Sequence, residues 1–174
     1  MTATLAPPLD DAVDHVLGPA AAPLELVMFG DFQCPYCRAA QSVVARVRSR
    51  LGERLRYAFR HLPIVEKHPL AQAAAEASES AAAQGRFWEY HDALFAGQPR
   101  LTQLGVLLAI AGEVGLDVSR VEDELADGRW AARVERDLRS ARDGGAPGTP
   151  TFFVNGRRHD DVFDAGTLVG ALER

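Results

Sequence analysis

Apolar runs and helical spacing alternate along the first third of the chain. Residues 24–29, LELVMF, form a short unbroken apolar run that is typical of a buried strand. Between residues 37 and 51 the apolar side chains recur every three or four positions, with polar side chains between them, which predicts an amphipathic helix. Residues 55–63, LRYAFRHLP, predict a second strand that a proline closes.

The pattern then becomes helical over a long central stretch. From His68 to Arg142 the sequence is rich in alanine and leucine at helical spacing, which predicts four or five helices. Strand character returns in TFFV, residues 151–154, where Asn-Gly favours a hairpin into a weaker strand at 157–161. Residues 164–174 predict a closing helix. The expected order is strand, helix, strand, helical block, hairpin and helix.

Length and composition point to one ordinary globular domain. A chain of 174 residues buries a sizeable core without cross-links, and no apolar run approaches the roughly 20 residues that span a bilayer. The net charge of −5 gives no general attraction to nucleic acid or anionic lipid, so neither nucleic acid nor a membrane is an expected partner. The first residues lack the basic and apolar segments of a secretory signal, which favours a cytoplasmic location.

The chain has two cysteines, Cys34 and Cys37, where the first strand passes into its helix. A redox couple, half of a metal site and a structural staple are the three uses open to them. At this spacing both sulfurs lie on one side of the first helical turn, with Cys37 in the buried stripe and Cys34 at an exposed mouth. Free N–H groups at a helix start lower a cysteine pKa from about 8.5 to roughly 3.5–7.5, and Pro35 fits the first helical position.

The alternatives to a redox couple find less support. A structural zinc site needs two further ligands, and the five histidines are scattered along the sequence without ligand spacing, so we expect no metal and no cofactor. Asp31 is expected to cap the turn before the helix. Phe32 is either core or an apolar rim for substrate, and Arg60 and His61 either flank the site or form a solvated strand end. The histidines are His15, His61, His68, His91 and His159.

Several motifs together resemble one family. FGDFQCPYCRAAQ, FRHLP, HPLAQAAAEA, GRFWEYHDALF and GTPTFFVNGRR, spread over residues 24–174, resemble the DsbA-like thioredoxin-fold proteins that carry a helical insertion. The resemblance implies an α/β fold in which a thioredoxin domain, residues 12–62 and 146–174, is interrupted by an all-helical insertion at 64–143. Residues 1–11 would then be a flexible tail.

The resemblance also implies a second part of the site. It implies a cis bond between Thr149 and Pro150, which turns the main chain of Thr149 toward the cysteines to pair with an extended substrate. Members of the family often have a glutamate where this chain has Met28, and the strongly oxidising members have a histidine where it has Tyr36. Pro35 and Tyr36 would tune the pair, and Tyr36 predicts a less oxidising couple.

These features lead to the hypothesis of a thiol–disulfide oxidoreductase. Cys34 would attack a substrate disulfide and Cys37 would resolve the mixed disulfide, with Thr149, Pro150 and Phe32 binding substrate. The expected partners are protein or small-thiol substrates that carry disulfides or thiols, and a redox recycling partner. A noncatalytic thioredoxin-like module that binds a partner or senses oxidation is the alternative, and a metallochaperone is a third.

Overall fold

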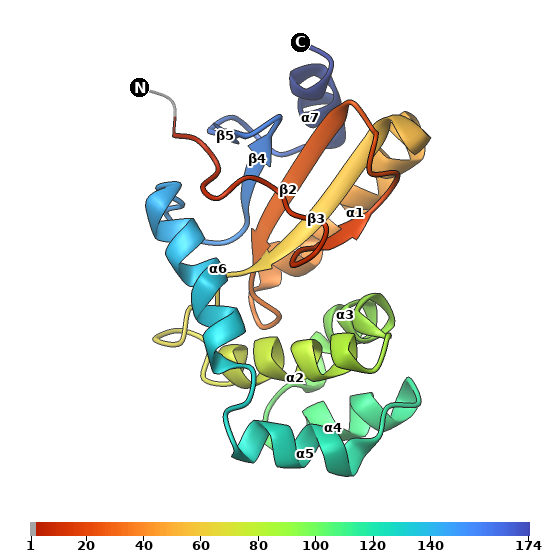
Figure 1. Ribbon diagram of the computed structural model, residues 1–174, viewed down its shortest axis with the longest axis vertical. Helices are drawn as coiled ribbons and strands as arrows, with labels where there is room; N and C mark the ends of the chain where they lie inside the picture. Colours follow the sequence, from red (N-terminus) through yellow and green to blue (C-terminus); the bar gives the residue numbers. More distant parts are fainter. Residues whose placement is uncertain (1–2) are drawn as a thin grey trace.

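A single five-stranded sheet forms the centre of the molecule. The computed structural model describes residues 3–174, and its strands lie in the order β1-β3-β2-β4-β5 (Figure 1). The strands are β1 (His15–Leu17), β2 (Leu24–Gly30), β3 (Leu55–His61), β4 (Thr151–Val154) and β5 (Arg157–His159). The helices are α1 (Pro35–Leu51), α2 (Ala71–Ala83), α3 (Phe87–Ala96), α4 (Leu104–Glu113), α5 (Val118–Ala126), α6 (Ala131–Asp143) and α7 (Ala165–Leu172). Two short 3-10 helices, η1 (Gly52–Arg54) and η2 (Gln98–Arg100), complete the elements.

Strand β2 has a continuous apolar run because both of its faces are buried. It pairs in parallel with β3 and antiparallel with β4, so it lies in the middle of the sheet. Leu26 and Met28 point into the core that α1 and α7 share, whereas Val27 and Phe29 point into a second core on the opposite face. The sheet is therefore covered on both sides.

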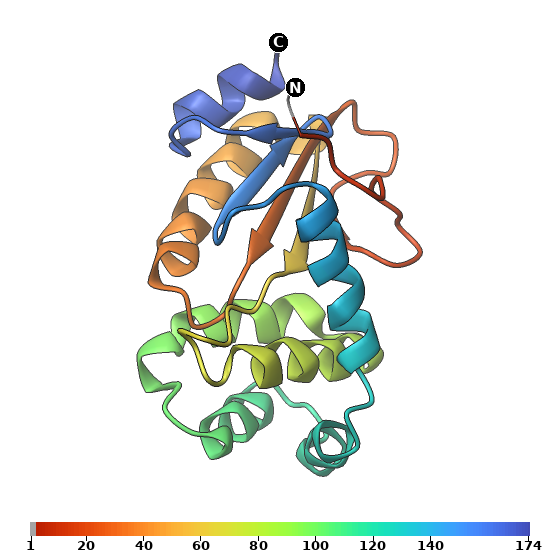
Figure 2. The ribbon, with the colours of Figure 1, turned by 90° about the vertical axis from the view of Figure 1, so that its left-hand side faces the viewer.

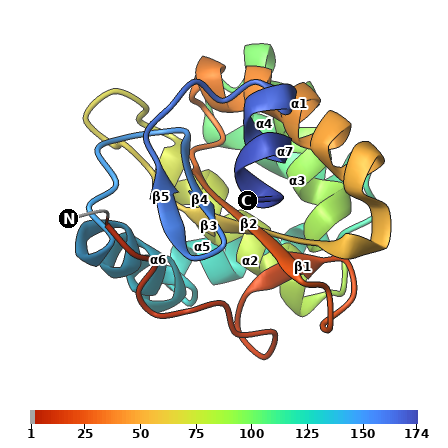
Figure 3. The ribbon, with the colours of Figure 1, turned by 90° about the horizontal axis from the view of Figure 1, so that it is seen from above.

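Helices α1 and α7 cover the first face. The buried side chains of α1 repeat at the spacing that the sequence pattern predicts. The helix is followed by Gly52, whose φ of 55° is a backbone conformation that residues other than glycine rarely adopt. α7 packs beside α1, as the view from above shows (Figure 3). The buried residues of α1 are Cys37, Ala40, Val44, Val47 and Leu51. Within residues 3–174, no helix combines the length and the apolar character that crossing a bilayer requires.

The helical insertion divides between two places. Helices α2 to α5 lie beyond the end of the sheet at which β2 and β3 finish (Figure 1). Helix α6 leaves them and runs along the second face of the sheet (Figure 2), where Leu138 and Ala141 pack with Phe153 and Val27. The prediction of one helical block at 64–143 does not account for the position of α6, which packs on the sheet. The apolar side chains of α6 contact residues of β2 and β4 that are far away in sequence.

The N-terminal segment is packed rather than loose. Residues 1–2 of the predicted tail lie outside the described part, but Leu5 is buried and its N–H donates to the carbonyl of Gly156. Main-chain carbonyls of Pro7 and Pro8 accept hydrogen bonds from Arg60. The expectation of a flexible tail is wrong for residues 3–11, because a buried guanidinium needs these acceptors. The short strand β1, which follows the segment, was also not expected from the sequence.

Arg60 and His61 are buried, so the expectation of a solvated strand end is wrong. The guanidinium of Arg60 is fully buried and donates to Asp14 through Nε at 2.9 Å and Nη2 at 2.7 Å. Its Nη1 also donates to Ser140 Oγ of α6 at 2.8 Å. This ion pair links the segment before β1, the strand β3 and helix α6, and its donors and acceptors are largely satisfied within the protein.

Removal of one partner of this ion pair leaves a buried charge without compensation. We expect Asp14→Ala to lower the free energy of unfolding by about 3–5 kcal/mol, measured by denaturant unfolding followed by circular dichroism. The matched variant is Glu113→Ala, which breaks the exposed pair with Arg100 and should leave the unfolding midpoint nearly unchanged. Equal destabilisation by the two variants would contradict this account of the Arg60 ion pair.

Candidate active site around the cysteine pair

Cys34 occupies the residue at which β2 has ended and α1 begins. Its backbone is extended, with φ −73° and ψ 119°, and its carbonyl accepts the N–H of Arg38 at 3.1 Å, so it is the N-cap of the helix. No side chain caps this end, and Pro35 follows at the first helical turn. The Cys34 sulfur therefore lies beside free main-chain N–H groups at the positive end of the helix dipole.

The two sulfurs differ strongly in acidity. Both cysteines are free thiols. A hydrogen bond from Cys37, aided by the main-chain N–H groups of Cys37 and Tyr36, lowers the pKa of Cys34 to about 5. Burial, the hydrogen bond to Cys34 and the negative charge of Cys34 raise the pKa of Cys37 far above its usual range. At neutral pH the arrangement holds a thiolate at Cys34 and a protonated thiol at Cys37.

Cys34 is less accessible than the helix geometry alone predicts. Cys37 is fully buried, as the stripe of α1 indicates, but Cys34 is only 4% exposed and not at an open mouth. The reason is the loop before β4, which places the carbonyl oxygen of Thr149 3.5 Å from the Cys34 sulfur. Tyr36 between the cysteines is 68% exposed and is the most prominent apolar side chain of the site.

The loop that covers Cys34 comes from the far end of the sequence. The bond between Thr149 and Pro150 is cis, and both residues are partly exposed beside the cysteine pair. The hydroxyl of Thr151 donates to the carbonyl of Gly148 at 2.6 Å, which closes the loop on itself just as β4 begins. Because β4 pairs with β2, the sheet itself brings this loop to the cysteines.

Phe32 is part of the core and not a rim for substrate. Its side chain is 1% exposed, and its ring lies 5.3 Å from that of Phe59 and 5.1 Å from that of Phe95, measured between centroids. The expectation that Phe32 binds substrate is therefore wrong. Its packing instead fixes the loop before Cys34 against the helical insertion.

Asp31 also anchors this loop and caps the turn before α1, as the sequence predicts. One carboxylate oxygen accepts the N–H of Gln33 at 2.8 Å, and the other accepts the N–H of Ile64 at 2.9 Å and the Nδ1 of His68 at 2.8 Å. The main-chain N–H of Asp31 points at the sulfur of Cys37, 3.5 Å away. Asp31 thus joins the cysteine loop to the segment that follows β3.

Two glutamines that the sequence does not single out join the same loop to the insertion, Gln98 from the insertion and Gln33 from the loop itself. The side-chain amide of Gln98, in η2, donates to the carbonyls of Phe32 at 2.8 Å and Cys34 at 3.0 Å. Gln33 donates to the carbonyl of Leu101 at 3.0 Å. Nothing in the local sequence around a glutamine 64 residues away points to this role, which depends on the tertiary fold alone.

Met28 lies under the pair where the family often has a glutamate. Its side chain is fully buried, and its sulfur is 3.7 Å from the hydroxyl of Tyr57 and 3.8 Å from the amide nitrogen of Gln41. A thioether accepts hydrogen bonds weakly and takes up no proton. Met28 therefore supplies no acid–base group to Cys37.

Two hollows flank the start of α1 and the loop before β4. One, of about 320 Å³, is lined by Pro35, Arg38 and Gln98 among others. The other, of about 200 Å³, is lined by Pro150 and Phe163 among others. The cysteine pair lies at the junction of these elements, which gives an extended molecule room on either side.

The chain matches known sequences over most of its length. A family model described as thioredoxin matches residues 10–174. The Na⁺/H⁺ antiporter NhaA 1 of Salinispora arenicola is 45% identical over 165 residues, which are 95% of this chain and 25% of that protein. The antiporter NhaA of Herminiimonas arsenicoxydans is 46% identical over 169 residues, 97% of this chain and 27% of that protein. The chain spans about a quarter of the length of these curated relatives.

Solved structures share the same architecture. BdbD from Bacillus subtilis, in its oxidised form, has a TM-score of 0.83 at 23% identity and covers 99% of this chain and 98% of its own. A thioredoxin-like oxidoreductase from Silicibacter pomeroyi has a TM-score of 0.82 at 28% identity, with 94% and 92% covered. Wolbachia pipientis alpha-DsbA1 has a TM-score of 0.80 at 20% identity, with 95% and 91% covered.

These matches confirm the α/β fold class and the resemblance that the motifs indicate. The order of elements, with helices inserted between β3 and β4, is that of a thioredoxin fold interrupted by a helical insertion. The chain belongs to the thioredoxin family and has the helical insertion of the DsbA-like proteins.

Proposed function

We propose that the chain is a thiol–disulfide oxidoreductase that uses Cys34 as the nucleophile and Cys37 as the resolving thiol. The observation that carries the proposal is the difference in acidity between the two sulfurs, with the pKa of Cys34 lowered to about 5 directly beside a buried, protonated partner. A thiolate is the reactive form of cysteine, so this pair is prepared for attack on a disulfide.

The reaction moves two electrons from the cysteine pair to the substrate. The Cys34 thiolate forms a bond to one sulfur of the substrate disulfide, whose S–S bond breaks and releases the other sulfur as a thiolate. Cys37 then loses its proton and attacks the Cys34 sulfur, which forms the Cys34–Cys37 disulfide and frees the second substrate thiol. If the pair starts oxidised, the same steps run in reverse, and a redox recycling partner restores the pair.

Loss of the Cys34 charge helps Cys37 to react. In the reduced pair, the hydrogen bond to Cys34 and its negative charge are two of the factors that raise the pKa of Cys37. Both disappear once Cys34 is bonded to a substrate sulfur, so the proton of Cys37 becomes easier to remove at the step that needs it. Met28 provides no base, so water or another base has to take this proton.

Polypeptides with thiols or disulfides are the substrates that the surface favours. Large apolar side chains are exposed at Tyr36, Val65, Leu104 and Val162. Tyr36 lies between the cysteines, Val65 follows Ile64, which donates to Asp31, and Val162 precedes Phe163 of the hollow beside Pro150. Leu104 instead lines a hollow among helices of the insertion. An extended peptide across this surface can pair with the main chain of Thr149, as in strand addition.

The low exposure of Cys34 is the observation that favours the alternative, a noncatalytic module that binds a partner or senses oxidation. A Cys34→Ala variant that keeps full cellular function would favour that module. The cytoplasmic location expected from the sequence stays a prediction, and the antiporter names belong to proteins about four times as long as this chain.

Replacement of the resolving thiol should trap the intermediate. We expect reduced Cys37→Ser protein to accumulate a covalent complex with a disulfide-bonded peptide, because the hydroxyl that replaces the Cys37 thiol cannot displace the peptide from Cys34. Non-reducing gels and mass spectrometry measure the complex. The double variant Cys34→Ser/Cys37→Ser should give none, and the absence of a complex with the single variant would overturn the proposed mechanism.

The rate of alkylation should follow the ionisation of Cys34. We expect the rate with iodoacetamide to reach half of its maximum near pH 5, to fall below that pH as the thiolate is protonated, and to stay level above it. Cys37→Ala should move this midpoint upward, toward the value of about 8.5 for a free cysteine, since it removes the strongest hydrogen bond to the thiolate. A wild-type midpoint near 8.5 would contradict the assignment of Cys34.

Gln98 should influence the same midpoint from the helical insertion. Gln98→Ala removes the donor to the Cys34 carbonyl, and we expect the pKa of Cys34 to rise by about 0.2–0.7 pH units, corresponding to roughly 0.3–1 kcal/mol. Gln103→Ala is the matched control, because Gln103 is exposed and its side chain caps nothing. Identical alkylation profiles for the two variants would show that Gln98 does not position Cys34.

A further inference from the structure

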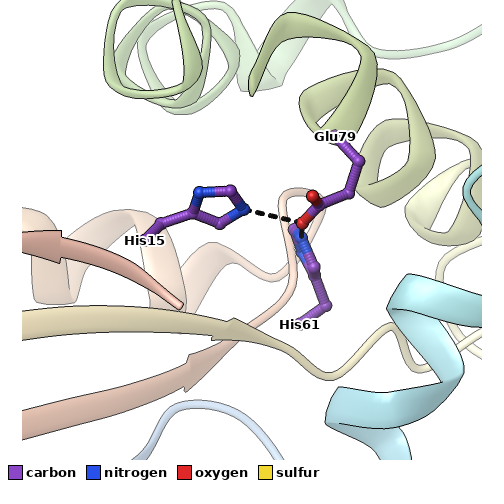
Figure 4. Close-up of side chains that lie close together, drawn as sticks. All are labelled: His15, His61 and Glu79. Carbon is purple, nitrogen blue, oxygen red and sulfur yellow. Dashed lines mark hydrogen bonds and ion pairs between the residues drawn. The ribbon is translucent and has the colours of Figure 1, made fainter. Parts of the chain in front are cut away.

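A group of two histidines and a glutamate lies between the sheet and the helical insertion, apart from the cysteine pair. His15 comes from β1, His61 from the end of β3 and Glu79 from α2 (Figure 4). The five histidines are scattered along the sequence without ligand spacing, but the fold brings two of them together around one carboxylate.

The three side chains point their donor atoms at one place. Nε2 of His15 lies 2.8 Å, and Nε2 of His61 lies 2.7 Å, from the same oxygen, Oε1 of Glu79. One ligand atom from each residue falls within 4.8 Å of the other two. The side chains of His15, His61 and Glu79 are 13%, 1% and 4% exposed, respectively. The group is therefore buried, and it reaches solvent beside His15.

Packing fixes the two imidazole rings. The ring of His15 stacks on Phe87 with centroids 3.5 Å apart, and the ring of His61 meets Phe59 edge-on at 5.6 Å. The group is therefore a pair of imidazoles, fixed by packing, with one carboxylate oxygen of Glu79 between them.

Arg133, a neighbouring cation, lies beside one carboxylate oxygen of Glu79 and leaves the other oxygen to the two imidazoles. Arg133 is 3.8 Å from the other oxygen of Glu79, Oε2, and its closer partner is Asp137, at 2.7 Å. Oε1 faces the histidines and Oε2 faces Arg133. Asp14 and Asp137 pair with the nearby guanidiniums of Arg60, Arg133 and Arg136. Glu79 makes a third carboxylate for the three guanidiniums, so these surroundings carry no excess of positive charge.

The geometry points to a divalent metal site at which Nε2 of His15, Nε2 of His61 and a carboxylate oxygen of Glu79 bind one Zn²⁺. Imidazole and carboxylate are ligands that zinc accepts, and three protein ligands with one water complete a tetrahedron. Ligands about 2.0–2.1 Å from zinc lie about 3.3 Å apart, so the nitrogens need to move about 0.5 Å from the oxygen. The water would occupy the His15 side, where the group reaches solvent.

Zinc binding would replace the hydrogen bond between Nε2 of His61 and Glu79 by a metal bond and would break no other hydrogen bond of this ring. To bind zinc, Nε2 must offer its lone pair, and the proton must move to Nδ1. Within residues 3–174, Nδ1 of His61 is buried without a hydrogen-bond partner, so it is unsatisfied in either tautomer. The bound ion would join β1 and β3 of the sheet to α2 of the insertion.

Zinc titration tests this site if the cysteines are first removed as ligands. We would use the Cys34→Ser/Cys37→Ser protein after chelator treatment, add zinc sulfate, and measure binding by calorimetry and the melting temperature. We expect one Zn²⁺ per chain and a rise in the melting temperature. Glu79→Gln and His15→Ala should each weaken binding at least tenfold and abolish that rise.

Matched variants and a folding check keep the test decisive. Glu113→Gln and His159→Ala change a residue of each type away from the group and should bind zinc as the parent protein does. Far-UV circular dichroism of each metal-free variant establishes that it is folded. The proposal is overturned if the folded parent binds no stoichiometric zinc, which would leave the group as a hydrogen-bonded link, or if binding survives both Glu79→Gln and His15→Ala.

Discussion

Parallel pairing of β2 and β3 is the constraint on which the rest of the molecule depends. Because the two strands run in the same direction, they end at the same edge of the sheet, where the insertion begins. The loop to Cys34 follows β2, and the buried His61 ends β3. β4 runs antiparallel to β2, so the Thr149–Pro150 loop that precedes it starts from the same edge. The Cys34 sulfur, the Thr149–Pro150 loop that covers it, and the proposed metal ligands His15 and His61 therefore lie near one edge of the sheet.

The helical insertion contributes to the site by position more than by its own reactive groups. Gln98 donates to the carbonyl of Cys34, and Phe95 packs on Phe32 in the loop before Cys34. On the other side of the same boundary, Glu79 joins the insertion to both histidines. The acidity of Cys34 and the geometry of the histidine group both depend on how firmly the insertion is seated on the sheet.

Local periodicity predicted the parts of this fold that short-range contacts determine. The helix from Pro35 to Leu51, the central strands and the buried place of Cys37 follow from side-chain spacing within a single element. The role of α6 could not be predicted in that way, because the partners of its apolar stripe come from β2 and β4. The burial of Arg60 was equally hidden, because its acceptors lie in the N-terminal segment and in α6.

The same distinction holds within the site. CPYC with a distant GTP motif was enough to single out the cysteines and the loop above them. It could not separate a core role from a surface role for Phe32, because an aromatic residue next to a helix start has the same sequence context in both cases. His15, His61 and Glu79 lie on three different elements, and only the packing of the insertion on the sheet makes them neighbours.

The contrast between an exposed Tyr36 and a nearly covered Cys34 has a consequence for selectivity. A small reagent can reach Cys34 without contacting the ring of Tyr36. A folded protein would contact this ring before the sulfurs of its disulfide came within bonding distance of Cys34. If Cys34 reacts with disulfides as proposed, this shape would favour disulfides in extended, flexible segments over those buried inside a folded domain.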